Sequence, residues 1–170
     1  MKVFKKIMNG SYFLLTCIIS IMIVVMLIIM SLEVVRRYLF GLTWSWSEEV
    51  VRYLLIYVTF LGGAAAFRSG SMVSFDLVLS RFPQRVQDIL SVIVNTVCLV
   101  FIGFILVLGF KKVITPNMIS QVSPSSGIAM WIPYASIPIG MFFLLLYIIE
   151  NYSVLFQRFR QNRSVKSESD

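Results

Sequence analysis

The chain has 170 residues, of which 58% are hydrophobic, and it carries a formal net charge of +7. Its mean hydropathy of +0.87 exceeds what a soluble domain can accommodate, because folding at this size removes only about 70% of the unfolded chain's surface from water. The basic residues lie between and beyond the apolar blocks rather than in one stripe, so the charge does not indicate a nucleic-acid partner. Composition therefore predicts a protein dissolved in a lipid bilayer.

Four apolar blocks are each long enough to cross the ~30 Å hydrocarbon core of a bilayer, which takes roughly 20 residues. Backbone amides find no water there, so spanning segments of this kind must be helices. The expected spans are 10–32, 48–67, 89–110 and 129–152. The sequence thus predicts an all-α membrane protein with four transmembrane helices in one domain, 1–157, and a basic tail, 158–170, whose polar composition predicts disorder.

A short polar corner separates the first two spans. Gly41 is the expected end of the first helix, and Trp44 and Trp46 suit the membrane–water interface. Ser45 and Glu48 have capping-box spacing, in which the two side chains satisfy amide donors at the start of a helix. We therefore expect this box to open the second helix.

Several later segments carry backbone signals. Gly62 and Gly63 open a run of small residues that lets another helix approach closely. The connection 68–85 mixes apolar and charged residues, a pattern typical of a short helix lying in the membrane surface. Proline and serine oppose regular structure in the next connection, up to Gly127. Pro133 falls in the first turns of the last span, whereas Pro138 lies deeper and is expected to kink it.

The distribution of basic residues predicts the orientation, because loops rich in lysine and arginine stay in the cytoplasm. Lys2, Lys5, Lys6, Arg68, Arg81, Arg85, Arg158, Arg160, Arg163 and Lys166 lie on one side. Arg36, Arg37, Arg52, Lys111 and Lys112 lie on the other. Ten against five places both termini in the cytoplasm.

The sequence contains no recognisable catalytic, metal or cofactor site. Histidine is absent, which removes the commonest general base and transition-metal ligand. Cys17 and Cys98 lie inside predicted spans, where small apolar fillers are expected and no disulfide. Asn95, within the third span, is interpreted as an interhelical hydrogen-bonding residue, with a polar lining role as the alternative.

Charged and aromatic residues gather near one membrane face, and two interpretations stay open for them. Anchoring at the interface and helix capping is one; a polar contact with a partner protein is the other. The candidate anchor or partner-interface residues, including the glycines and prolines of the helix-contact segments, are Arg36, Arg37, Trp44, Trp46, Glu48, Glu49, Arg52, Gly62, Gly63, Pro133 and Pro138.

Three segments in order resemble a known family. The first runs from Arg37-Tyr38 to Trp46-Ser47-Glu48-Glu49 and Arg52, the second covers 60–68 and Asp76-Leu77, and the third covers Ser123-Pro124, Ile132-Pro133-Tyr134 and Ile137–Gly140. Together they resemble the small, DctQ-like membrane subunit of tripartite ATP-independent periplasmic (TRAP) transporters. Met72 departs from the pattern, because many members of that family have histidine at this place.

The resemblance implies partners rather than chemistry on this chain. In that family a much larger multi-span subunit holds the solute and sodium sites and moves, while a periplasmic protein delivers a carboxylate solute such as sialic acid or a C4-dicarboxylate. The small subunit is thought to support the static scaffold in the bacterial inner membrane. No cofactor is expected on this chain, and sodium coupling is expected on the partner.

Two competing hypotheses follow from the residues. A self-sufficient four-helix transporter acting as a homodimer would need an essential intramembrane charge, with Glu33 or Glu48 as the candidates. A small membrane enzyme would need a constellation of catalytic groups, which the chain lacks because it has no histidine and its carboxylates lie on one rim.

Overall fold

The computed structural model describes residues 2–69 and 84–167. It comprises α1 (Lys2–Phe40), α2 (Ser47–Arg68), α4 (Gln84–Ile114), α5 (Pro116–Ser120) and α6 (Trp131–Ser167). Four helices are long and apolar enough to cross a membrane, over Lys6–Phe40, Ser47–Arg68, Val92–Ile114 and Trp131–Tyr152. The expected all-α fold with four transmembrane helices is confirmed. The predicted interfacial helix, with Met72 and Asp76, lies outside the described residues.

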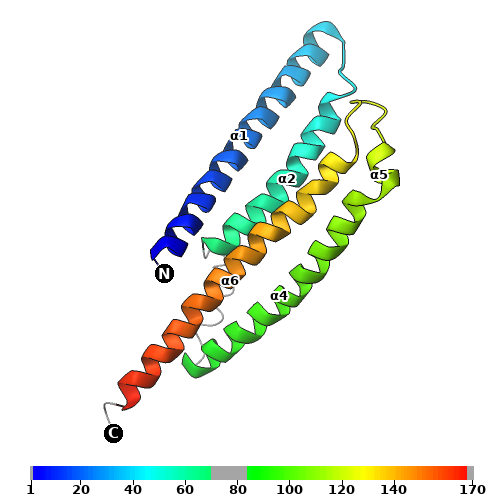
Figure 1. Cartoon of the computed structure of the whole chain (residues 1–170). Coiled ribbons are helices and arrows are strands. Elements are labelled where there is room, and N and C mark those ends of the chain that lie inside the picture. Colours follow the sequence, from blue (N-terminus) through cyan, green and yellow to red (C-terminus); the bar gives the residue numbers. More distant parts are fainter. Residues whose placement is uncertain (1, 70–83, 168–170) are drawn as a thin grey trace.

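The four long helices form a layer rather than a closed bundle. α1 packs on α2, α2 on α6, and α6 on α4, with α5 against the end of α4. Figure 1 shows this order, with α1 and α4 at opposite edges and both termini at the same end. We call this the terminal end. The opposite end, which holds the α1–α2 corner and the α4–α6 connection, is the loop end.

Small residues set the spacing of α6 from its two neighbours. A Cβ added to Gly140 would lie 2.6 Å from the Cβ of Phe60, so α6 crosses α2 at van der Waals distance there. On the other flank, a Cβ at Gly109 of α4 would meet the Cδ of Pro138 at 3.3 Å. Close approach of backbones is how helices associate where lipid supplies no hydrophobic drive. The Ile137–Gly140 segment therefore joins three helices.

An apolar core fills the space between α1, α2 and α6 toward the terminal end. Met8 and Leu15 of α1 meet Leu61 and Ala64 of α2 and Tyr147 of α6. All five side chains are nearly inaccessible, and Ala64 is 0% exposed. The predicted helix contact in the second half of α2 is thus confirmed for Ala64.

Two local predictions are wrong. α2 begins at Ser47 with Trp46 as N-cap and no side-chain capping bond, so the Ser45–Glu48 capping box does not form. α6 continues to Ser167, and the disorder expected for 158–170 stays a prediction. The α4–α6 connection contains α5 and an isolated bridge between Val122 and Ala129, because Gly127, at φ +69°, lets the chain fold back on itself.

Candidate functional site

The α1–α2 corner is held by backbone groups that bond to side chains. Gly41 ends α1 with φ +65°, as predicted. The amide of Trp44 donates to both carboxylate oxygens of Glu33, at 3.2 and 3.3 Å. Ser47 donates its hydroxyl to the carbonyl of Trp44 at 2.8 Å. Glu33 is only 9% exposed, so it serves the corner rather than the membrane surface.

Aromatic stacking completes the corner. The Arg36 guanidinium lies 4.3 Å from the centre of the Trp44 ring, and Trp44 stacks on Trp46 with 5.5 Å between centroids. A cation over an indole face is attracted by the ring quadrupole. Arg36, Trp44 and Trp46 are therefore engaged inside this chain.

Glu49 ties the first turn of α2 to the α4–α6 connection. Tyr53 donates to its Oε1 at 2.6 Å, and the Ser123 hydroxyl donates to the same oxygen. Tyr53 also lies 3.6 Å from the sulfur of Met130. The other carboxylate oxygen, Oε2, is buried without a good hydrogen bond, although Ser126 lies close to the carboxylate. Glu49 thus fixes the loop end of α6 to α2.

A second charged cluster closes the terminal end, and sequence reasoning missed it. Arg68 donates to Glu150 through Nε at 2.8 Å and through Nη2 at 3.1 Å, and to Asn9 at 2.7 Å. Its guanidinium also lies 5.1 Å and 5.3 Å from the ring centres of Tyr12 and Tyr147. One arginine therefore joins α1, α2 and α6. The sequence offered one signal for this pair, because Arg68 and Glu150 lie at the same end of two predicted spans and carry opposite charges.

Among the candidate residues, the two prolines are buried, whereas the two glycines of α2 face open space. Pro133 and Pro138 are buried, and Pro138 lies within α6, which continues as helix on both sides; a kink there stays a prediction. Gly62 and Gly63 face open space, since a Cβ added to either meets nothing within 4 Å. These two glycines therefore do not serve the internal helix contacts.

Arg37, Glu48 and Arg52 point away from the rest of the chain. All three are exposed, and within residues 2–69 and 84–167 none takes part in an ion pair, because Arg68–Glu150 is the pair found there. Glu48 and Arg52 stand four residues apart on α2 without joining. The structure thus sorts the predicted candidates into internal ties and a smaller outward set of Arg37, Glu48, Arg52, Gly62 and Gly63.

The third span contributes a polar link one residue from the predicted position. Asn95 is 6% exposed, but the hydrogen bond between α4 and α6 joins the Thr96 and Tyr152 hydroxyls. Tyr152 also donates to the carbonyl of Val92 at 3.3 Å. The polar groups at this depth thus link helices.

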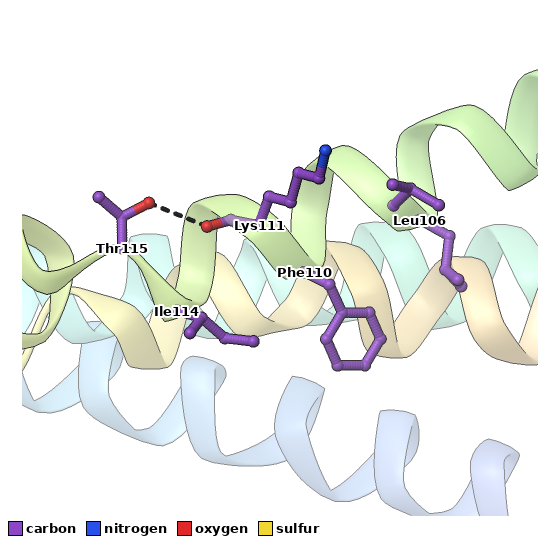
Figure 2. Close-up of a pocket in the computed structure, with 6 residues that line it drawn as sticks. Leu106, Phe110, Lys111, Ile114 and Thr115 are labelled. Carbon is purple, nitrogen blue, oxygen red and sulfur yellow. Dashed lines mark hydrogen bonds between the residues drawn. The ribbon is translucent and has the colours of Figure 1, made fainter.

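An apolar groove of about 440 Å³ runs along the outer side of α4 near the loop end. Its lining comprises Leu106, Val107, Phe110, Lys111, Ile114 and Thr115. Thr115 donates its hydroxyl to the Lys111 carbonyl at 2.9 Å, and Figure 2 shows the Lys111 amine on the opposite side of the helix from the Phe110 ring. Such a surface suits an acyl chain, because polar groups that would orient a charged solute do not converge on it. In the described part of the chain, three or more metal-ligating side chains of the His, Cys, Asp or Glu type do not gather.

Comparison with known proteins gives a consistent result. The family model described as tripartite ATP-independent periplasmic transporters, DctQ component, matches residues 26–158. A putative TRAP transporter small permease protein of Haemophilus influenzae is 31% identical over 79% of this chain and 83% of its own length. The sialic acid TRAP transporter small permease protein of Vibrio cholerae is 26% identical over 85% and 81%. An isethionate TRAP transporter permease protein, DctMQ, of Oleidesulfovibrio alaskensis is 26% identical over 56% of this chain, which covers only 15% of that protein.

Proposed function

Because the chain belongs to the DctQ component family of TRAP transporters, we propose that it is the small accessory subunit of a sodium-coupled importer and supports the scaffold of a larger membrane subunit. Its family and its four apolar helices make it a multi-pass inner membrane protein. Both termini face the cytoplasm in this proposal, which follows the ten-to-five division of basic residues.

The proposal rests on three buried or half-buried carboxylates, because each of them joins one helix to another part of the chain. Glu33 holds the α1–α2 corner, Glu49 joins α2 to the α4–α6 connection, and Glu150 binds Arg68. Transport coupling on one chain usually needs an ionisable group near the middle of the membrane. Among the described spans, no acidic or basic side chain lies near the middle of an apolar segment; Glu33 and Arg52 lie deepest, seven and five residues from the ends of their spans. A helix layer in which Glu33, Glu49 and Glu150 join helices suits a scaffold.

The solute is an organic anion that a periplasmic binding protein delivers to the larger subunit. Relatives are named for sialic acid, a carboxylate, and for isethionate, a sulfonate, so anionic character is what these solutes share. We favour a carboxylate solute of the sialic acid or dicarboxylate type. The match to a small part of the DctMQ protein supports a partner much larger than this chain, with the sodium site on that partner.

Reconstitution tests the proposal directly. The chain is coexpressed with the large multi-span subunit encoded beside it, purified in detergent through a tag on the small chain, and placed in liposomes with a sodium gradient and the solute-loaded binding protein. We expect stable copurification, and uptake only when both membrane chains are present. Uptake by this chain alone, as a homodimer, would overturn the proposal.

A further inference from the structure

One outward face of α2 carries two opposite charges near the loop end. Its exposed positions are three or four residues apart and therefore lie on one side of the helix. They are Glu48, Arg52, Leu55, Thr59, Gly63 and Ala66. We call this set the polar face of α2. The side of α2 that contains Leu61 and Ala64 is packed against α1 and α6.

Arg52 enters the apolar region on this face without an ion pair in the described part of the chain. α2 has 22 residues, which gives about 33 Å at ~1.5 Å per residue and barely exceeds the ~30 Å hydrocarbon core. Arg52 lies about 8 Å along the helix from Ser47 by the same rise. The tryptophans just before α2 mark the interface at that end. Charges at membrane depth pair with other groups or line a water-filled space, and within residues 2–69 and 84–167 Arg52 forms no ion pair, although its charge acts on the neighbouring Tyr53 hydroxyl.

The middle parts of α1 and α4 expose mainly large apolar side chains. Leu27 on α1 and Val97 and Phe104 on α4 are 62%, 63% and 64% exposed, and such bulky aliphatic and aromatic side chains suit lipid tails. The polar face of α2 has one large apolar residue, Leu55. The Thr59 hydroxyl is satisfied by the Leu55 carbonyl at 2.8 Å, so Arg52 is the group on this face that lipid tails do not suit. Open space at Gly63 allows another helix to approach closely.

We propose that the polar face of α2 is the surface that docks on the large subunit, against a transmembrane helix that presents a carboxylate to Arg52. This inference rests on the proposed function and adds the place of contact. The occupant is the large subunit, because the chain belongs to a family of transporter components and matches a small part of a much larger permease protein, and lipid tails offer no counter-charge to Arg52. A second copy of this chain, whose Glu48 could face Arg52, is an outcome that the crosslinking test separates. Arg52 fixes the orientation of the two subunits, and Gly63 lets their backbones approach.

Two glycine variants test the docking surface with a matched control. Gly63→Leu adds bulk on the polar face, whereas Gly103→Leu adds the same bulk on α4; both glycines have open space beside them, so the isolated chain tolerates either change. We expect Gly63→Leu to reduce the large subunit recovered with the tagged small chain at least tenfold, and Gly103→Leu to leave recovery within twofold. Monodisperse elution of each variant alone verifies folding.

A charge variant and a photo-crosslinker complete the experiment. Arg52→Glu should reduce recovery of the large subunit at least tenfold, while Lys112→Glu, at the loop end of α4, should not. A photoreactive residue at Thr59 should crosslink to the large subunit, and one at Val97 should not. If wild type copurifies but position 59 crosslinks to lipid or to a second copy, or if Gly63→Leu binds normally, the docking surface is wrong and the accessory role stands. If wild type recovers no large subunit, the accessory role itself fails.

Discussion

The charged residues at the two ends of α2 differ in whether they bind other groups of this chain. At the terminal end Arg68 is surrounded by Glu150, Asn9 and two aromatic rings, all from this chain. At the loop end the Glu49 carboxylate is bonded internally, but Glu48 and Arg52, one turn apart, both face outward. The charged side chain at the terminal end of α2 is therefore bonded within this chain, whereas two charged side chains at the loop end remain directed outward.

This difference suggests that the terminal end of α2 stabilises the isolated subunit, whereas its loop end is available for assembly with a partner. Side chains of the Arg68–Glu150 pair are 14% and 16% exposed, so its contribution belongs to the stability of the isolated subunit. Arg52 is exposed and forms no ion pair in the described part of the chain, so it should contribute little to that stability. Substitutions at the two arginines should therefore separate folding from assembly.

Removing the Arg68 charge should give the largest effect on the isolated subunit. Arg68→Gln leaves the mostly buried Glu150 without its cation and detaches Asn9 of α1. Breaking a buried pair costs about 3–5 kcal/mol in soluble proteins, and polar contacts in membranes contribute less because the separated helices also find partners. We expect a loss of about 2–3 kcal/mol on this basis, measured by SDS titration of the purified chain in mixed micelles.

The matched control is Arg52→Gln, the same substitution 16 residues, or about four turns, away on the same helix. It should leave the free energy of unfolding of the isolated chain unchanged within error. Equal losses at both arginines would show that the two ends of α2 do not differ in the way the contacts indicate.

The second-largest loss of stability is expected from a substitution at the crossing of α2 and α6. Gly140→Ala places a Cβ 2.6 Å from the Cβ of Phe60, so α2 and α6 must move apart. Overpacking of this kind costs about 1–3 kcal/mol. Gly103→Ala, which meets nothing within 4 Å, is the control and should be neutral or slightly stabilising in the same SDS titration. A neutral Gly140→Ala would contradict the close crossing.

How much of this could be predicted depends on the distance along the chain between the groups involved. The four spans follow from local composition, and the end of α1 follows from Gly41. Arg68–Glu150 and Phe60–Gly140 join residues about 80 positions apart in sequence, and no local pattern specifies which of several helix faces meet. The layered order of helices was unpredictable for the same reason.

The candidate site shows a second limit, at the start of α2. Ser45 and Ser47 compete for the same local role, and capping-box spacing favoured Ser45. In the structure Ser47 bonds the carbonyl of Trp44, whose amide is already held by Glu33. That carboxylate comes from α1, so a tertiary contact overrides the local preference. Sequence reasoning identified the residues of the rim but not which of them face inward.

Substitution of Glu33 should give the smallest loss of stability. It also distinguishes a scaffold role of this chain from a role in transport coupling. Its carboxylate accepts the Trp44 amide at 3.2 and 3.3 Å, so Glu33→Ala leaves a backbone donor without its partner and should cost about 1 kcal/mol in the SDS titration. Glu33→Gln keeps an acceptor oxygen and should lie close to wild type. In liposomes with the large subunit, Glu33→Gln should also preserve solute uptake, because the role of the group is to hold the α1–α2 corner. Uptake abolished by Glu33→Gln in a stably assembled complex would instead place a coupling charge on this chain.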